Sequence, residues 1–158
     1  MMRNPLGRAQ KNTLQNRFIQ LIEKDHEAIT NYFINDLLKN PDTTAYRAMD
    51  REKLFYVCDM IYRELSQWIS RDFNKEKIRE RYMKIARERL NIAIPFSQVQ
   101  KALVLQKRHL WLYLADKLYD DKTAYMEALD LSNRVILYFD RATFYVLKAY
   151  EELLNKKF

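Results

Sequence analysis

The stretch that decides the fold is residues 122–155, KTAYMEALDLSNRVILYFDRATFYVLKAYEELLN, which contains neither glycine nor proline. Its apolar residues recur at alternating spacings of three and four, which predicts one long helix at the C-terminal end of the chain. They form two adjacent seams along that helix. The first seam is Ala128, Leu131, Val135, Tyr138, Ala142, Tyr145 and Ala149, and the second is Leu129, Ser132, Ile136, Phe139, Thr143, Val146, Tyr150 and Leu153.

Two apolar seams on one helix are more than a single core requires. One seam is enough to pack a helix against its own domain. The second seam therefore predicts a further contact surface, and we expect a second copy of the chain there. The alternative is a central helix that its own domain surrounds. The predicted interface residues on this helix come from the first seam: Leu131, Val135, Tyr138, Ala142, Tyr145 and Ala149.

The remainder of the chain predicts an all-α fold of five or more helices. Apolar spacing indicates helices over about residues 11–39, 50–70, 75–92 and 95–119, the first with or without a break at Lys24–Asp25. Asn40 precedes Pro41 and should end the first helix, because a residue before proline disfavours the helical region. Asp50 and Asn74 are expected N-caps. We predict a flexible basic tail over residues 1–10 and a single domain over residues 11–158.

Composition excludes several functional classes. The chain has 158 residues with one glycine, so a phosphate-binding loop that needs several glycines cannot be built. Its single cysteine, Cys58, rules out an internal disulfide and favours a cytoplasmic location; a buried apolar role is expected, with a redox thiol as the alternative. The longest apolar run, Leu110–Ala115, is far shorter than the roughly 20 residues of a membrane-spanning helix. We therefore expect no membrane partner.

The chain is basic, and its excess of positive charge lies in two separate segments. The net charge is +7, and both residues 1–17 and residues 71–91 carry an excess of Lys and Arg. In the second segment the charges are interleaved on a helix, as on a solvated face. A nucleic-acid-binding module would need a concentrated basic stripe or a recognisable motif. Nucleic-acid binding therefore remains only an alternative function.

Catalytic and metal-binding patterns are missing from the sequence. The two histidines, His26 and His109, are far apart, and neither has a Cys or Asp partner at ligand spacing on its own helix face. The chain contains no HExxH, CxxC or EF-hand pattern, and it lacks the two Glu-x-x-His pairs, one on each of two helices, that a di-iron bundle requires. We predict a protein that is not an enzyme, with no catalytic residue, no metal and no cofactor.

One segment carries a family resemblance. Residues 85–95 read IARERLNIAIP, which resembles the I-A-x-x-H-x-x-I-G-I segment of globin-coupled sensors. In haem-binding members of that family, the histidine is the proximal ligand of the iron. Arg89 stands at that position here, and Ala93 stands in place of the glycine. A protonated guanidinium offers no lone pair to iron. The resemblance therefore covers the residues around this position but not the haem ligand itself.

A closer resemblance is to the haem-free branch, the N-terminal domains of stressosome RsbR-type co-antagonists and of related bacterial histidine kinases. It rests on Arg89, on the Ala93–Pro95 turn, and on Ala102-Leu103 followed by Arg108-His109-Leu110-Trp111, and it covers about Leu14 to Leu154. The resemblance implies a globin-like sensor fold that dimerises through its last two helices, which adds Trp111 to the interface. It also implies that a signal leaves the C-terminal helix towards an output domain or a signalling partner.

Three residues are candidates for a ligand pocket, should a small ligand bind. Arg89 lies on the face that lines the pocket in the family, so its charge must pair with an acid, be hydrated, or hold an anionic ligand. His109 is expected in the core or at its rim, with axial haem ligation as the alternative. Tyr32 would lie on the distal side in a globin-like fold. The predicted function is a haem-free sensory module, with a haem-binding globin sensor and a basic nucleic-acid-binding module as alternatives.

Overall fold

The computed structural model describes residues 13–70, 74–118 and 125–155, so the predicted tail over residues 1–10 lies outside the described residues. Within these ranges the structure is helical and contains no strand, which confirms the predicted all-α class and the long C-terminal helix. The elements are α2 (Leu14–Lys39), the 3-10 helix η2 (Pro41–Ala48), α3 (Arg51–Ile69), α4 (Lys75–Asn91), α5 (Phe96–Lys117) and α6 (Tyr125–Asn155).

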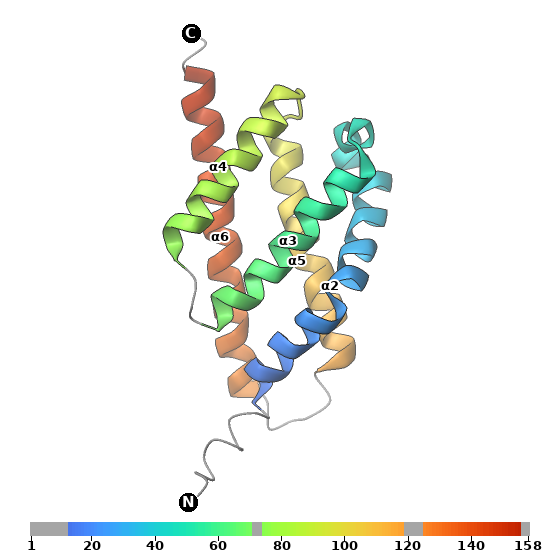
Figure 1. The fold of residues 1–158 in the computed structure, drawn as a ribbon, viewed down its shortest axis with the longest axis vertical. Helices are drawn as coiled ribbons and strands as arrows, with labels where there is room; N and C mark the ends of the chain where they lie inside the picture. The colour runs from blue at the N-terminus through green and yellow to red at the C-terminus, as the bar shows by residue number, and fades with distance from the viewer. Residues whose placement is uncertain (1–12, 71–73, 119–124, 156–158) are drawn as a thin grey trace, which may run out of the picture.

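The helices form two layers. In Figure 1, α3 and α4 lie in front of α5 and α6, and α2 closes the right-hand side. Helix α4 packs on α6, and α2 packs on α3 and α5. The turn between α4 and α5 lies at the same end of the molecule as the C-terminal end of α6 (Figure 1). Helices α3 and α4 therefore make up the front layer, and the back layer carries the long helix α6 (Figure 1).

Helix ends follow local chemistry. The side chains of Asp50 and Asn74 accept hydrogen bonds from the backbone amides of Glu52 and Glu76, at 3.2 and 2.9 Å, which confirms both predicted N-caps. Helix α2 runs without a break through residues 24 and 25. After α2, the chain forms η2, which was not predicted because a short 3-10 helix leaves no periodic apolar pattern.

Tyrosines fill much of the centre of the core. Tyr62, Tyr82 and Tyr138 are fully buried. The hydroxyls of Tyr82 and Tyr138 lie 2.9 Å apart, and the Tyr62 hydroxyl donates to the backbone carbonyl of Gln106 at 2.7 Å. Each buried hydroxyl therefore keeps the hydrogen bond that it would otherwise lose on leaving water. These bonds tie α4 to α6 and α3 to α5.

Candidate functional site

A small cavity lies inside the core, next to Arg89. Its volume is about 30 Å³, enough for one or two waters or a few atoms of a ligand. Most of its wall is apolar, and its polar lining consists of Tyr46, Cys58, Tyr82, Arg89 and Gln106. No Asp or Glu side chain lines it among the residues that the structure describes. The cavity thus combines an apolar wall with one positive charge.

Arg89 is buried without an acidic partner. Its side chain comes from the last turn of α4, and the residue is only 5 % exposed. The guanidinium lies over the ring of Tyr46, 5.8 Å from the ring centre, and its Nε is buried without a hydrogen-bond partner. No ion pair links Arg89 to a carboxylate within the described ranges. A buried charge without a counter-charge costs several kcal/mol, so this position calls for a functional explanation.

The groups around Arg89 remain neutral. Burial raises the pKa of the Cys58 thiol to about 12, with the charge of Arg89 acting in the opposite direction. Burial also raises the pKa of Tyr46 above its ordinary value, again against the effect of Arg89. The Gln106 side chain donates to the backbone carbonyl of Cys58 at 3.1 Å. None of these neighbours neutralises the guanidinium, so the cavity favours a group that brings a negative charge.

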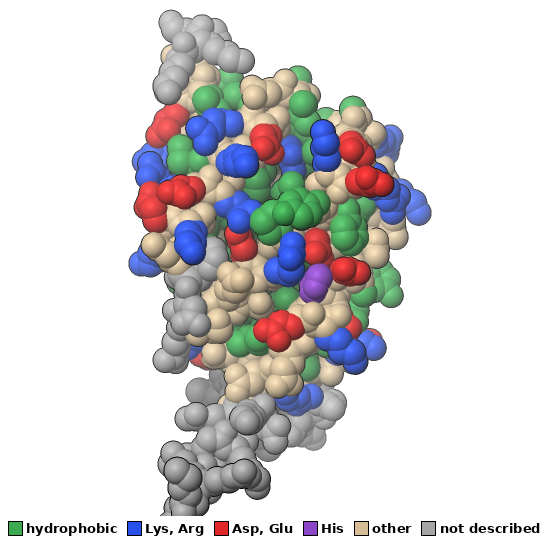
Figure 2. Space-filling view, in the orientation of Figure 1, with side chains coloured by type: hydrophobic (Ala, Val, Ile, Leu, Met, Phe, Trp, Pro, Cys, Tyr) green, Lys and Arg blue, Asp and Glu red, His purple; other side chains and the backbone are tan. Residues whose placement is uncertain are grey.

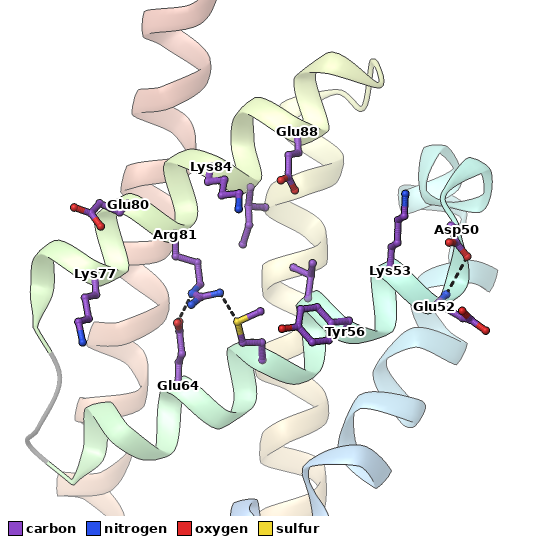
Figure 3. Close-up of a pocket in the computed structure, with 13 residues that line it drawn as sticks. Asp50, Glu52, Lys53, Tyr56, Glu64, Lys77, Glu80, Arg81, Lys84 and Glu88 are labelled. Atoms are coloured by element: carbon purple, nitrogen blue, oxygen red, sulfur yellow. Dashed lines mark hydrogen bonds and ion pairs between the residues drawn. The ribbon is translucent and has the colours of Figure 1, made fainter.

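A wide groove separates α3 from α4 on the front of the molecule. It has a volume of about 770 Å³. Figure 3 shows its charged rim, with Lys77, Glu80, Lys84 and Glu88 on α4 and Lys53 on α3. Figure 2 shows hydrophobic side chains lying among these charges on the same face. The apolar part of the groove is formed by Tyr56, Val57, Met60 and Ile85.

The groove is bridged by an ion pair and shares part of its lining with the cavity. Glu64 of α3 forms this ion pair with Arg81 of α4 (Figure 3). Burial raises the pKa of Glu64, and the neighbouring charge of Arg81 opposes that rise. Val57 and Ile85 line both the groove and the cavity. These two side chains are therefore the partition between solvent and the buried Arg89.

The other two pocket candidates lie elsewhere. Tyr32 and His109 meet at an outer pocket of about 430 Å³ between α2 and α5. His109 Nε2 lies 2.7 Å from Asp36 Oδ2, and this hydrogen bond lowers the pKa of Asp36. Neither Tyr32 nor His109 lines the cavity that contains Arg89. The structure thus brings two of the three candidates together and separates both from the third.

Sequence reasoning did not name Tyr46, Gln106 or the Glu64–Arg81 pair as site residues. Gln106 left a signal, since it is a polar side chain in the apolar stripe of α5 and is 2 % exposed. Tyr46 had no comparable signal in the sequence, because the helix that contains it, η2, was not predicted. The Glu64–Arg81 pair joins two different helices, so no spacing within one helix could reveal it.

The predicted interface seam faces the core of the chain itself. Trp111 and Tyr145 are half-buried, and the other five predicted interface residues are buried: Leu131, Val135, Tyr138, Ala142 and Ala149. Residues of the second seam, among them Phe139, Val146 and Tyr150, are buried beside them. The apolar residues that α6 exposes are Leu129, Ile136, Leu137, Phe144 and Leu147. Five of the seven predicted interface side chains are thus buried by their own domain, whereas Trp111 and Tyr145 remain partly accessible, as does the exposed set of α6.

The described residues offer neither a cluster of metal ligands nor a membrane-spanning helix. Within the described ranges, no group of three or more His, Cys, Asp or Glu side chains could hold a metal ion. Among the helices that the structure describes, none is both long and apolar enough to cross a bilayer.

Comparison with known proteins identifies a family that the chain matches. The model of a protein family described as the RsbT co-antagonist protein rsbRD N-terminal domain matches residues 40–155. The matched region begins directly after α2 and runs to the last residue of α6, so it contains Arg89, the groove and the exposed face of α6. No curated protein and no solved structure matches the chain.

Proposed function

The chain belongs to the family of rsbRD-type N-terminal domains, and on that premise we propose that it is a haem-free sensory module. The family indicates a regulatory domain of the stressosome type. In the proposed function, a small ligand binds at Arg89, two copies of the chain associate, and α6 relays the signal to an output domain or a partner protein.

Arg89 is the single observation that carries the sensory part. Its guanidinium is buried beside a cavity and lacks a carboxylate partner among the described residues. A ligand with a negatively charged group would supply the missing counter-charge, and it would be bound strongly because the guanidinium is buried. A movement of Val57 and Ile85 would open the cavity to the groove. The proposed ligand is therefore a small molecule with an anionic group.

Thermal unfolding with acetate and phosphate as probe anions tests this ligand class. We expect at least one probe to raise the melting temperature of the natural chain and to have no such effect on Arg89→Met, because a ligand stabilises the state that binds it. The matched control is Arg87→Met, which removes an exposed arginine from the same helix. An equal effect of both anions on all three proteins would contradict a site at Arg89.

The outer face of α6 supports the homodimer. Phe144 is 59 % exposed and Leu129 is 61 % exposed, and Ile136, Leu137 and Leu147 extend the same helix with further exposed apolar side chains. Val104 and Leu112 of α5 are also exposed. Contiguous exposed apolar surface is rare on a soluble monomer and marks an interaction site. We therefore place the dimer on the exposed faces of α5 and α6.

Light scattering of Phe144→Glu tests the placement. We expect a dimer for the natural chain and a monomer with an unchanged helical circular dichroism spectrum for the variant, because a carboxylate cannot be buried in an apolar interface. The control is Tyr56→Glu, which introduces the same charge at a similarly exposed aromatic residue, 61 % exposed, on α3. A natural chain that remains monomeric at high concentration would refute the dimer.

The haem alternative has a direct test. Arg89 occupies the position at which the family resemblance places the proximal histidine, and a guanidinium does not ligate iron. We expect the protein to show no Soret band after incubation with haemin. A Soret band that is lost in a His109→Phe variant would instead support axial ligation by that histidine.

A further inference from the structure

The turn between α4 and α5 joins the Arg89 cavity to α6. Helix α4 ends at Asn91, two residues after Arg89, and α5 begins at Phe96. Within this turn, the backbone amide of Ile94 donates to the backbone carbonyl of Arg89 at 2.9 Å. The position of Ile94 is therefore tied directly to the residue whose side chain lies at the cavity.

The same turn is tied to α6 by Tyr150. The Tyr150 hydroxyl donates to the backbone carbonyl of Ile94 at 2.8 Å, and this hydrogen bond is buried. Burial raises the pKa of Tyr150 to about 12, so the hydroxyl keeps its proton near neutral pH. The Tyr150 ring also lies against the ring of Phe96, with the centres 6.2 Å apart. Ile94 is thus bonded through its amide to α4 and through its carbonyl to α6.

The backbone of the turn is strained at one residue. Ala93 has a φ of 60°, and it is the sole non-glycine residue with positive φ in the described ranges. An alanine in the left-handed region costs about 1 kcal/mol or more relative to an ordinary conformation. The hydrogen bonds of Ile94 on both sides hold this conformation in place. If either hydrogen bond were lost, Ala93 could return to negative φ, and the strain would be released.

We propose that residues 92–95 form a switch that transmits the state of the Arg89 side chain to α6, with Tyr150 as the positioning residue on the receiving helix. The inference rests on the proposed function for the identity of the signal, an anionic group at Arg89. When the guanidinium is drawn towards a counter-charge, the last turn of α4 shifts and the Ile94 carbonyl shifts with it. The Tyr150 hydroxyl follows that carbonyl, and α6 moves near the end from which a signal would leave. The Arg89 cavity and the end of α6 then both shift the equilibrium between two conformations of the turn over residues 92–95. Such a shared two-state element is the physical requirement for coupling.

Hydrogen–deuterium exchange of the whole chain tests the switch without any ligand. Arg89→Met removes the buried charge, and we expect it to change exchange in the turn and in residues 146–154 of α6 by about fivefold or more, the lower end of typical allosteric coupling. In a Tyr150→Phe background the same substitution should still change the turn, but the change in α6 should fall below about twofold. Ala93→Gly perturbs the turn directly and serves as the second variant if Arg89→Met folds poorly.

Tyr62→Phe is the matched control, because it removes another buried hydroxyl that donates to a backbone carbonyl, at 2.7 Å, away from the turn. In that background the effect of Arg89→Met on α6 should be the same as in the natural chain. The switch is refuted if Arg89→Met never changes exchange in α6, or if it changes α6 equally with and without the Tyr150 hydroxyl. Neither result depends on finding a ligand, and light scattering of the same samples reports separately on the dimer.

Discussion

Two arginines of α4 lie in opposite circumstances. Arg81 reaches across the groove to Glu64 of α3, and its side chain is 29 % exposed. Arg89, eight residues later on the same helix, is more deeply buried and has no carboxylate partner in the described part of the chain. Arg81 is what a structural arginine looks like, since its charge is balanced by the fold itself. Arg89 has no balancing carboxylate among the described residues, and for that reason the proposed function places an anionic ligand there.

The largest effect should come from removing the structural arginine. Arg81→Met leaves Glu64 buried without its ion-pair partner, and we expect a loss of about 3 kcal/mol in the free energy of unfolding. Urea denaturation near neutral pH measures it. Because burial raises the pKa of Glu64, its carboxylate is destabilising above that pKa and the cost disappears once the group is protonated. The deficit of the variant should therefore shrink as the pH falls through this raised pKa, and it should reach its minimum below 4.5, the ordinary value for Glu64.

Replacing Arg89 should change the free energy of unfolding in the opposite direction. Arg89→Met replaces an unbalanced buried charge with an apolar side chain of similar length, and we expect the ligand-free protein to gain about 1–3 kcal/mol. The measurement is urea denaturation of protein that has been unfolded, dialysed and refolded. A loss similar to that of Arg81→Met would mean that the fold balances both arginines, and the contrast between them would vanish.

A substitution in the turn after Arg89 should raise the free energy of unfolding by a smaller amount. Ala93→Gly removes the steric cost of a positive φ, and we expect a gain of about 0.5–1 kcal/mol in the free energy of unfolding. The control is Ala86→Gly, at a fully buried position inside α4. This variant should lose about 1 kcal/mol in the free energy of unfolding, because glycine is a poor helix former. Equal losses in both variants would contradict the strain assigned to Ala93.

The smallest effect should come from a third basic side chain, His109. Its hydrogen bond lowers the pKa of Asp36, so the pair contributes stability above pH 3.8 that is lost as the pH falls through the lowered pKa. We expect His109→Leu to remove this acid-dependent part of the stability, in urea midpoints compared between pH 3 and pH 5. An unchanged acid dependence would mean that the bond does not influence the titration of Asp36.

Much of the fold could be predicted because helix formation is local. Asp50 and Asn74 cap their helices through hydrogen bonds to amides two residues away, so the sequence around each contains the whole interaction. Arg89 could also be singled out, by a family resemblance at one position. Its surroundings could not be predicted, because Tyr46, Cys58 and Gln106 come from three other elements. Their distances depend on how helices cross, which no spacing within a helix encodes.

The sequence by itself determined that this protein is helical, where most of its helices end and that its last helix is apolar on more than one side. Only the tertiary structure decided which side of α6 is buried. Successive residues of a helix are separated by about 100°, so the adjacent seams of α6 merge into one broad apolar surface. Contact with α3, α4 and α5 covers Leu131, Val135 and Tyr138 and leaves Phe144 in solvent. The same packing places Arg89 beyond the reach of any described carboxylate, since burial depends on neighbours that lie far away in the chain.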